Sequence, residues 1–89
     1  MRIEIIKTSS KFRRQYKRLP EKIKNAAKEK ESVFRANAFD SRLTTHKLHG
    51  KDKEAWAFYV TPRQYRIKFV FLTPWSVLFL EIGTHRIYK

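Results

Sequence analysis

Hydrophobic and polar side chains alternate near the start of the chain and again in its last third. The segment 2–7 alternates with a period near two and is rich in isoleucine, which is typical of a β-strand. The segments 55–60, 65–71 and 76–82 are also strand-like, and short runs that contain proline separate them. These patterns predict one early strand and a later meander of three strands.

Between the early strand and the meander, the apolar spacing becomes helical. Residues 11–19 place apolar side chains at i, i+4 and i+7, and Ser9 or Ser10 before them is a suitable N-cap. Pro20 ends this helix and opens a second one, whose apolar spacing continues to about Ala38. The segment 39–54 loses all periodicity and is polar, basic and rich in histidine, which indicates a long functional loop.

The predicted element order is β-α-α-β-β-β within one domain, residues 1–89. This order indicates an α+β fold in which a helical hairpin covers one face of an antiparallel sheet. Alternation along the strands directs one set of side chains toward the helices: Trp56, Phe58, Val60, Tyr65, Ile67, Phe69, Phe71, Leu78, Leu80 and Ile82. The other set should point away from the helices and form an open face: Ala57, Tyr59, Arg66, Lys68, Phe79 and Glu81.

The charge of the chain narrows the choice of partners. With 21 Lys+Arg against 8 Asp+Glu, the formal net charge is +13 over 89 residues. A hydrophobic content of 42% indicates a folded domain instead of a disordered basic tail. Basic residues occur along the whole chain, which favours nucleic acid over a membrane surface as the partner.

The composition and the first residues also exclude several classes of protein. The chain contains no cysteine, so it has no disulfide and no thiolate site, and we expect a cytoplasmic protein. The N-terminal segment lacks an apolar core typical of a signal peptide, and no apolar run is long enough to span a membrane. His46 and His49 have no recognisable pattern of carboxylates around them, so we expect no metal and no cofactor.

Two histidine-bearing segments should meet at the open face. One is the 39–54 loop, which leads into the first meander strand, and the other is the C-terminal segment 83–89. Histidines beside Arg66 and Lys68 suit metal-independent cleavage of an RNA phosphodiester, in which two groups move protons and cations stabilise the charged phosphorane. By residue types alone, however, such a surface is more often an RNA-binding surface than a nuclease site.

Three sequence elements carry a resemblance to a known family. They are the Leu-x-Gly element 48–50, the Tyr-Arg-Ile element 65–67, and the terminal Gly-Thr-His-x-x-Tyr element 83–88. Together with the predicted strand and helical hairpin, they make nearly the whole chain resemble the RelE/ParE superfamily of bacterial toxins. The resemblance is greatest to the mRNA interferase branch that includes RelE and YafQ.

This resemblance implies a function and a site. It implies the toxin of a type II toxin–antitoxin pair, a ribosome-dependent mRNA endoribonuclease that is neutralised by a cognate antitoxin. We expect the free toxin to be a monomer. The catalytic residues that it implies are His46 as the acid, His85 as the base, Arg66 on the scissile phosphate, and Tyr88 as an aromatic that orients mRNA. The RNA-binding residues expected alongside them are Lys47, Lys51, Lys53, Arg63, Lys68 and Arg86.

Two positions depart from the pattern of the family. Tyr59 stands where related enzymes often carry Arg or His, and Arg63 stands where the YafQ-like pattern has an acid. Two side chains that usually contribute to catalysis in the family are therefore absent, so a weakened or inactive nuclease is an open alternative. A ParE-like inhibitor of DNA gyrase and a non-catalytic basic RNA-binding domain are the alternative functions.

Overall fold

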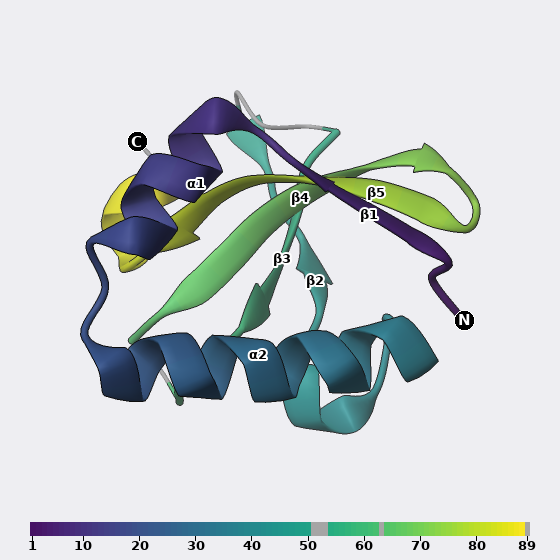
Figure 1. Cartoon of the computed structure of the whole chain (residues 1–89). Coiled ribbons are helices and arrows are strands. Elements are labelled where there is room, and N and C mark those ends of the chain that lie inside the picture. The colour runs from purple at the N-terminus through teal and green to yellow at the C-terminus, as the bar shows by residue number, and fades with distance from the viewer. Residues whose placement is uncertain (51–53, 63, 89) are drawn as a thin grey trace.

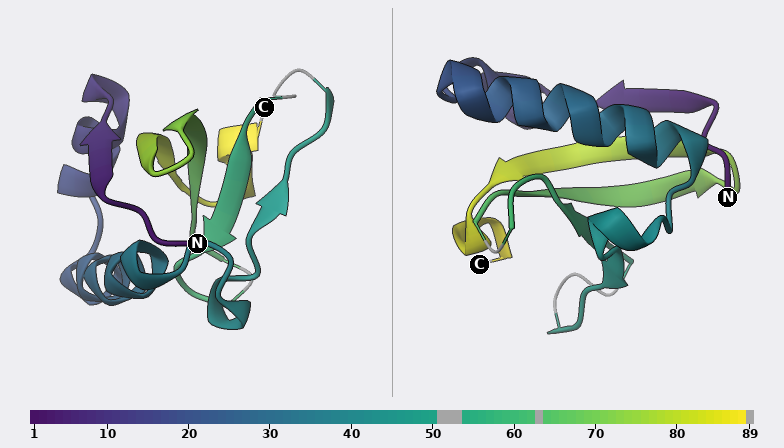
Figure 2. Two further views of the ribbon diagram at one scale, coloured as in Figure 1. Left: turned by 90° about the vertical axis from the view of Figure 1, so that its right-hand side faces the viewer. Right: turned by 90° about the horizontal axis from the view of Figure 1, so that it is seen from below.

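The described elements follow the predicted order, with three short additions, two 3-10 helices and one strand of two residues. The computed structural model describes residues 1–50, 54–62 and 64–88. In this part the elements are β1 (Ile5–Thr8), α1 (Ser10–Lys17), α2 (Glu21–Ala36), the 3-10 helix η1 (Ser41–Leu43), β2 (His46–Lys47), β3 (Trp56–Tyr59), β4 (Arg66–Thr73), β5 (Ser76–Gly83) and the 3-10 helix η3 (His85–Tyr88). The strands form one sheet of order β1-β5-β4-β3-β2. Both helices lie on one side of this sheet, and η3 lies on the other (Figures 1 and 2).

The α+β class and the helix-covered sheet are confirmed, but the expectation of a wholly antiparallel sheet is wrong. β2, β3, β4 and β5 pair antiparallel, whereas β1 pairs with β5 in parallel. Two parallel neighbours require a long crossover connection, and here the helices together with β2, β3 and β4 supply it. The loop predicted over 39–54 also contains η1 and the two-residue strand β2.

Local sequence explains where the helices begin. The hydroxyl of Ser9 accepts a hydrogen bond of 2.9 Å from the backbone N–H of Phe12, so Ser9 is the N-cap of α1 and Ser10, the other candidate from the sequence, is its first residue. Pro20 precedes α2, a position where its missing N–H costs nothing. Each helix directs a phenylalanine into the core, Phe12 from α1 and Phe34 from α2.

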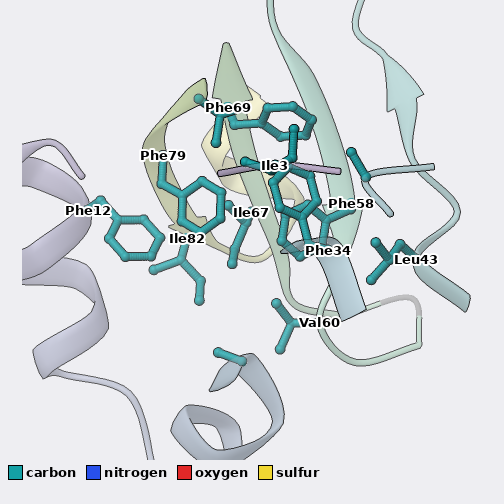
Figure 3. Packing of buried hydrophobic residues seen from close by; sticks show 13 residues of the cluster. Ile3, Phe12, Phe34, Leu43, Phe58, Val60, Ile67, Phe69, Phe79 and Ile82 are labelled. Carbon is teal, nitrogen blue, oxygen red and sulfur yellow. The ribbon is translucent and has the colours of Figure 1, made fainter. Parts of the chain in front are cut away.

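Aromatic rings form the centre of the core between α2 and the sheet. The ring of Phe34 lies 4.7 Å from Phe58, 4.9 Å from Phe69 and 5.6 Å from Phe79, as centroid separations. Figure 3 shows these rings together, with Phe12 approaching Phe79 from α1 at 5.4 Å. Offset and edge-to-face ring pairs of this kind add about 0.5–1.5 kcal/mol each beyond the burial of their surface.

A β-bulge in β5 changes which of its side chains face the core. Lys68 pairs with Glu81, but Phe69 pairs with Phe79, so Leu80 has no partner of its own on β4. The extra residue reverses the alternation, and Phe79 is therefore buried in the core at 1% exposure. The expectation that Phe79 faces away and that Leu78 and Leu80 face the helices is wrong, because simple alternation does not anticipate an inserted residue.

Candidate functional site on the open face

Cross-strand pairing sets the neighbours on the open face, the sheet face turned away from the helices. Residues directly opposite each other on antiparallel strands have Cβ atoms about 4.5–5.5 Å apart. One row across β2, β3, β4 and β5 consists of His46, Ala57, Lys68 and Glu81. The neighbouring row across β3, β4 and β5 consists of Tyr59, Arg66 and Gly83.

Four side chains on this face form a continuous set of ring contacts, which we call the ring site: His46, Tyr59, Arg66 and Tyr88. The His46 and Tyr59 rings stack with centroids 5.8 Å apart. The Arg66 guanidinium carbon lies 4.8 Å from the centroid of Tyr59 and 5.2 Å from that of Tyr88. The site thus combines three of the four predicted catalytic residues with Tyr59, which joins His46 to Arg66.

Arg66 is held as a largely desolvated cation. The residue is 8% exposed, and its contacts with two tyrosine rings are of the cation–π type, which strengthens when water is excluded. Stacking engages the faces of a guanidinium, whereas its N–H donors lie in the plane of the group. Burial raises the pKa of the Tyr88 phenol, and the adjacent Arg66 charge offsets only part of that rise. Tyr88 is therefore a neutral hydrogen-bond donor at neutral pH.

The backbone at Thr44 orients the His46 ring. The Nδ1 atom of His46 lies 2.9 Å from the carbonyl oxygen of Thr44. A carbonyl oxygen only accepts, so Nδ1 carries the hydrogen and Nε2 is the ring nitrogen left for another partner. Thr44 adopts the left-handed conformation with φ of 50°, which is costly for a β-branched residue. This strain lies two residues from the predicted catalytic histidine.

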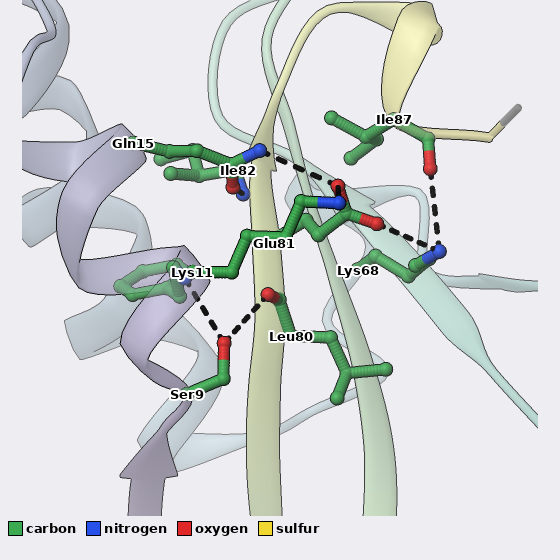
Figure 4. A network of polar contacts seen from close by, with 9 residues as sticks. Ser9, Lys11, Gln15, Lys68, Leu80, Glu81, Ile82 and Ile87 are labelled. Atoms are coloured by element: carbon green, nitrogen blue, oxygen red, sulfur yellow. Dashed lines mark hydrogen bonds and ion pairs between the residues drawn. The ribbon is translucent and has the colours of Figure 1, made fainter.

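The 3-10 helix η3 is anchored to the sheet at two points. Gly83 allows close approach, because a Cβ atom at this position would lie 2.8 Å from Cγ2 of Ile87. The Nζ atom of Lys68 donates a hydrogen bond of 3.2 Å to the carbonyl oxygen of Ile87 (Figure 4). These contacts hold the turn that carries Tyr88 over Arg66.

Glu81 connects this anchor to α1. Its carboxylate lies 3.0 Å from the Nζ atoms of both Lys68 and Lys11, and Gln15 donates a further hydrogen bond of 3.3 Å to it. Burial alone would raise the pKa of the Glu81 carboxyl, but the contacts with Lys68 and Lys11 together lower it. The open face thus contains an ion-pair network whose carboxylate stays charged at neutral pH.

The helix α1 closes the edge of β5 where β1 ends. The Ser9 hydroxyl donates to the carbonyl oxygen of Leu80 at 2.8 Å, and the backbone N–H of Ile82 donates to Oε1 of Gln15 at 2.8 Å (Figure 4). Unpaired backbone groups at a sheet edge are costly when they are buried, so these side chains replace the missing strand.

The remaining predicted residues lie in different surroundings. His85 and Arg86 are exposed at the start of η3, and no contact between His85 and His46 is seen among the described residues. The two histidine-bearing segments do converge, but through Tyr88, which packs against a small cluster that contains Leu48. Lys47 is exposed and lies 5.9 Å from the ring centroid of Trp56, on the helix-covered face.

Lys68 is 7% exposed, and the ion pair with Glu81 occupies its ammonium group, so its position is that of an anchoring residue. The predicted RNA-binding residues Lys51, Lys53 and Arg63 lie outside the described part of the chain. Among the residues that the structure does describe, no group of three His, Asp or Glu side chains is arranged to hold a metal ion.

Sequence reasoning treated Tyr59 as a missing contributor, yet this residue connects the whole ring site. Its strand position was predicted correctly, and Arg66 was placed on the same face. The signal that would have linked them is the register of the β3–β4 hairpin, which pairs the two residues directly. Thr44 was also missed, because a positive φ at a threonine has no sequence signature.

Comparison with known proteins rests on structure, since no protein-family profile and no curated protein sequence matches the chain. YafQ in the E. coli DinJ-YafQ toxin–antitoxin complex aligns with a TM-score of 0.73 at 20% identity, over 98% of this chain and 97% of that one. The chain has the RelE/ParE toxin fold. A YoeB/ParE toxin from Agrobacterium tumefaciens aligns with a TM-score of 0.76 at 10% identity, over 92% of this chain and 99% of that one. The RelE/ParE fold also occurs in the archaeal RelE-RelB complex from Pyrococcus horikoshii, with a TM-score of 0.71 at 14% identity over 94% and 96% of the chains.

None of the helices in the described ranges is long and apolar enough to cross a membrane.

Proposed function

We propose that this protein is the toxin of a type II toxin–antitoxin pair and acts as a ribosome-dependent mRNA endoribonuclease. The observation that carries the proposal is the ring site, in which a proton-exchanging histidine and a desolvated arginine share one face of a RelE/ParE-fold sheet. Cleavage of a phosphodiester without a metal needs a group that transfers protons, such as a histidine, and a fixed cation that stabilises the developing negative charge.

The reaction that these groups suit is an internal transesterification of RNA. The 2′-oxygen of one nucleotide attacks the adjacent phosphorus, the new 2′-O–P bond forms, and the P–O5′ bond breaks. A base accepts the 2′-OH proton while an acid donates a proton to the departing 5′-oxygen. The products are a 2′,3′-cyclic phosphate and a 5′-hydroxyl, with protons and charge balanced.

We assign His46 as the acid and His85 as the base by resemblance to the family. The Thr44 carbonyl bound to Nδ1 of His46 suits this assignment, because the charged imidazolium keeps that hydrogen bond and directs its second N–H, on Nε2, to the leaving oxygen. His85 is exposed on η3, three positions before Tyr88, and we expect it to approach the substrate from the side of η3.

Arg66 is the group we assign to the phosphorane, the five-coordinate intermediate with extra negative charge. A preorganised cation in a site with little water stabilises developing charge more strongly than the same cation in solvent. Tyr59 and Tyr88 hold the guanidinium in position, and Lys68 acts through η3 instead of by direct contact with RNA. The exposed residues Lys47 and Arg86, together with Lys51, Lys53 and Arg63, remain the proposed RNA-binding cations.

A cognate antitoxin completes the proposed function. A protein of the same fold, YafQ, has been solved with DinJ as a toxin–antitoxin complex. With a net charge of +13, this chain should bind an acidic antitoxin segment that covers the helices and the basic open face. We expect it to be neutralised by such a partner.

The test is to map mRNA ends after induced expression and in a translating extract. We expect new 5′-hydroxyl ends within translated messages for the wild type. Replacing either His46 or His85 with Ala should lower the rate of cleavage roughly 10²–10⁴-fold, because each moves a proton in the proposed reaction. The His46→Ala/His85→Ala variant removes both groups. Lys28→Ala on the exposed side of α2 serves as the matched control and should leave cleavage unchanged.

Other outcomes identify the alternatives. Growth arrest with intact messages and broken DNA would support a ParE-like gyrase inhibitor and overturn the nuclease proposal. Expression without any effect on growth or on messages would favour a non-catalytic RNA-binding domain. Cleavage by the double histidine variant at the wild-type rate would show that the acid and base are misassigned.

A further inference from the structure

A pocket adjoins the ring site. It is an open pocket of about 360 Å³ between α2, η1 and the end of β3, within the range of roughly 300–1,000 Å³ that is usual for ligand pockets. Its wall includes Lys30, Arg42, Thr44, Tyr59 and Thr61. Tyr59 and Thr44 are the residues that contact or orient His46, so the two sites share a wall.

The pocket wall combines apolar surface from Val60 and Pro62 with several hydrogen-bond donors and a net positive charge. Lys30 supplies an ammonium group, and the Thr61 hydroxyl accepts from the backbone N–H of Tyr65, which leaves its own hydrogen to donate. Arg42 binds Asp40 through Nε and Nη2 at 2.9 Å each. Among the described residues of the wall, that carboxylate balances one of the two cations, which leaves one positive charge for a ligand.

These features select the chemistry of the occupant. Hydroxyl, ammonium and guanidinium donors around a single excess positive charge suit a phosphodiester, which carries one negative charge and accepts several hydrogen bonds. An apolar side chain would leave the donors without partners, and a cation would be repelled by Lys30. Tyr59 lies in the pocket wall and also contacts Arg66, so a polymer that contacts both sites suits this arrangement better than a free phosphate.

We propose that this pocket binds the phosphate and sugar of the nucleotide next to the scissile position of single-stranded RNA. This inference rests on the proposed function, since it extends the same substrate. It assigns binding roles to Lys30 and Thr61, two residues that have no part in the proposed chemistry. An acidic peptide is the competing occupant.

The experiment compares two non-cleavable probes, a deoxydinucleotide and a deoxytetranucleotide, which lack the attacking 2′-OH. Only the longer probe can fill both the ring site and the pocket. We expect the tetranucleotide alone to shift the backbone amide resonances of Arg42 and Thr61 in the wild-type protein. If neither amide responds to the tetranucleotide, the pocket is not an RNA subsite.

Substitutions in α2 measure how much Lys30 contributes to tetranucleotide affinity and to its salt dependence. Lys30→Gln should weaken tetranucleotide binding roughly threefold and reduce the magnitude of the salt slope by about 0.7, the value for one phosphate contact on a single strand. Lys28→Gln is the matched control, because it removes the same charge from the same helix at a residue outside the pocket wall. Equal losses from Lys28→Gln and Lys30→Gln would overturn the proposal, and recovery with Lys30→Arg would support it.

A third probe, a hexaglutamate peptide, separates the two classes of ligand. If the peptide shifts the Arg42 and Thr61 amides in a Lys30-dependent manner and the tetranucleotide does not, the pocket is a peptide site and the proposal fails. None of these measurements requires cleavage. Failure of the nuclease proposal would appear as absent mRNA cleavage with Lys30-dependent tetranucleotide binding intact, whereas failure of the subsite would leave cleavage intact.

Discussion

Removing the charge of Glu81 while keeping its shape tests how the open face is held together. The substitution Glu81→Gln preserves an oxygen acceptor but leaves Lys68, whose side chain is 9% exposed, without its carboxylate at 3.0 Å. Removing one partner from a buried ion pair costs about 3–5 kcal/mol. Because the glutamine oxygen still accepts a hydrogen bond, we expect a smaller loss in the free energy of unfolding, about 2 kcal/mol. For a domain of this size that loss lowers the Tm by roughly 8–16 °C.

The matched control is Lys11→Met. Lys11 lies the same 3.0 Å from the Glu81 carboxylate, but its side chain is 60% exposed, so its pair is screened by water. Its removal should cost less than about 1 kcal/mol. Chemical denaturation of the two single variants, of Lys68→Met and of the Glu81→Gln/Lys68→Met double variant measures the coupling directly. Additive losses in the double variant would refute the argument that the Lys68–Glu81 pair is a coupled unit.

The same substitution has a pH signature with a defined sign. The pKa of Glu81 is lowered in the folded protein, so its stabilisation is complete above the ordinary glutamate pKa and is lost as the pH falls through the folded value. The stability difference between wild type and Glu81→Gln should therefore be constant near neutral pH and shrink below about pH 4. Asp40, whose pKa is lowered to about 2 chiefly by its hydrogen bond with Arg42, titrates in both proteins and cancels in the difference. A difference independent of pH down to pH 2 would refute this reasoning.

Further predictions concern the site and its partners. Tyr59→Leu should lower the rate of single-turnover cleavage roughly 10–100-fold and change its pH profile, because His46 and Arg66 lose the ring that positions them. Tyr59→Phe keeps the ring and should retain both the rate and the pH profile. Equal effects of the two substitutions would exclude a positioning role for Tyr59. Gly83→Ala should displace η3 through a clash with Ile87 and reduce cleavage while the core stays folded. Hydrogen exchange of the backbone amides in η3 measures the displacement. Unchanged exchange would contradict the conclusion that Gly83 anchors η3 to the sheet. RNA affinity should fall with salt at a log–log slope of roughly −3.5 for about five phosphate contacts, and a flat response would exclude electrostatic binding. The antitoxin should raise the Tm of the chain, and an unchanged Tm would argue against the complex.

Local patterns were enough to predict the elements and the fold class. Alternation and helical spacing depend on side chains within a few residues of one another, so the helices, the meander and a cap at Ser9 or Ser10 could be predicted from the sequence. The placement of Arg66 on the open face follows from the same alternation, because this half of β4 is regular. The positions of His46, Arg66 and Tyr88 as candidate site residues came from motif resemblance, and only the structure reveals their mutual contacts.

The tertiary structure decided what depends on long-range pairing. Three features depend on residues from different strands: the bulge at Leu80, the parallel pairing of β1 with β5, and the stacking of Tyr59 on His46. Local periodicity does not determine the register between strands, so the sequence pattern could not predict them. Lys68 shows the consequence most clearly. Its sequence surroundings suggest an RNA-binding cation, but folding brings Glu81 and the Ile87 carbonyl to its ammonium group, and these partners, not its charge alone, determine its role.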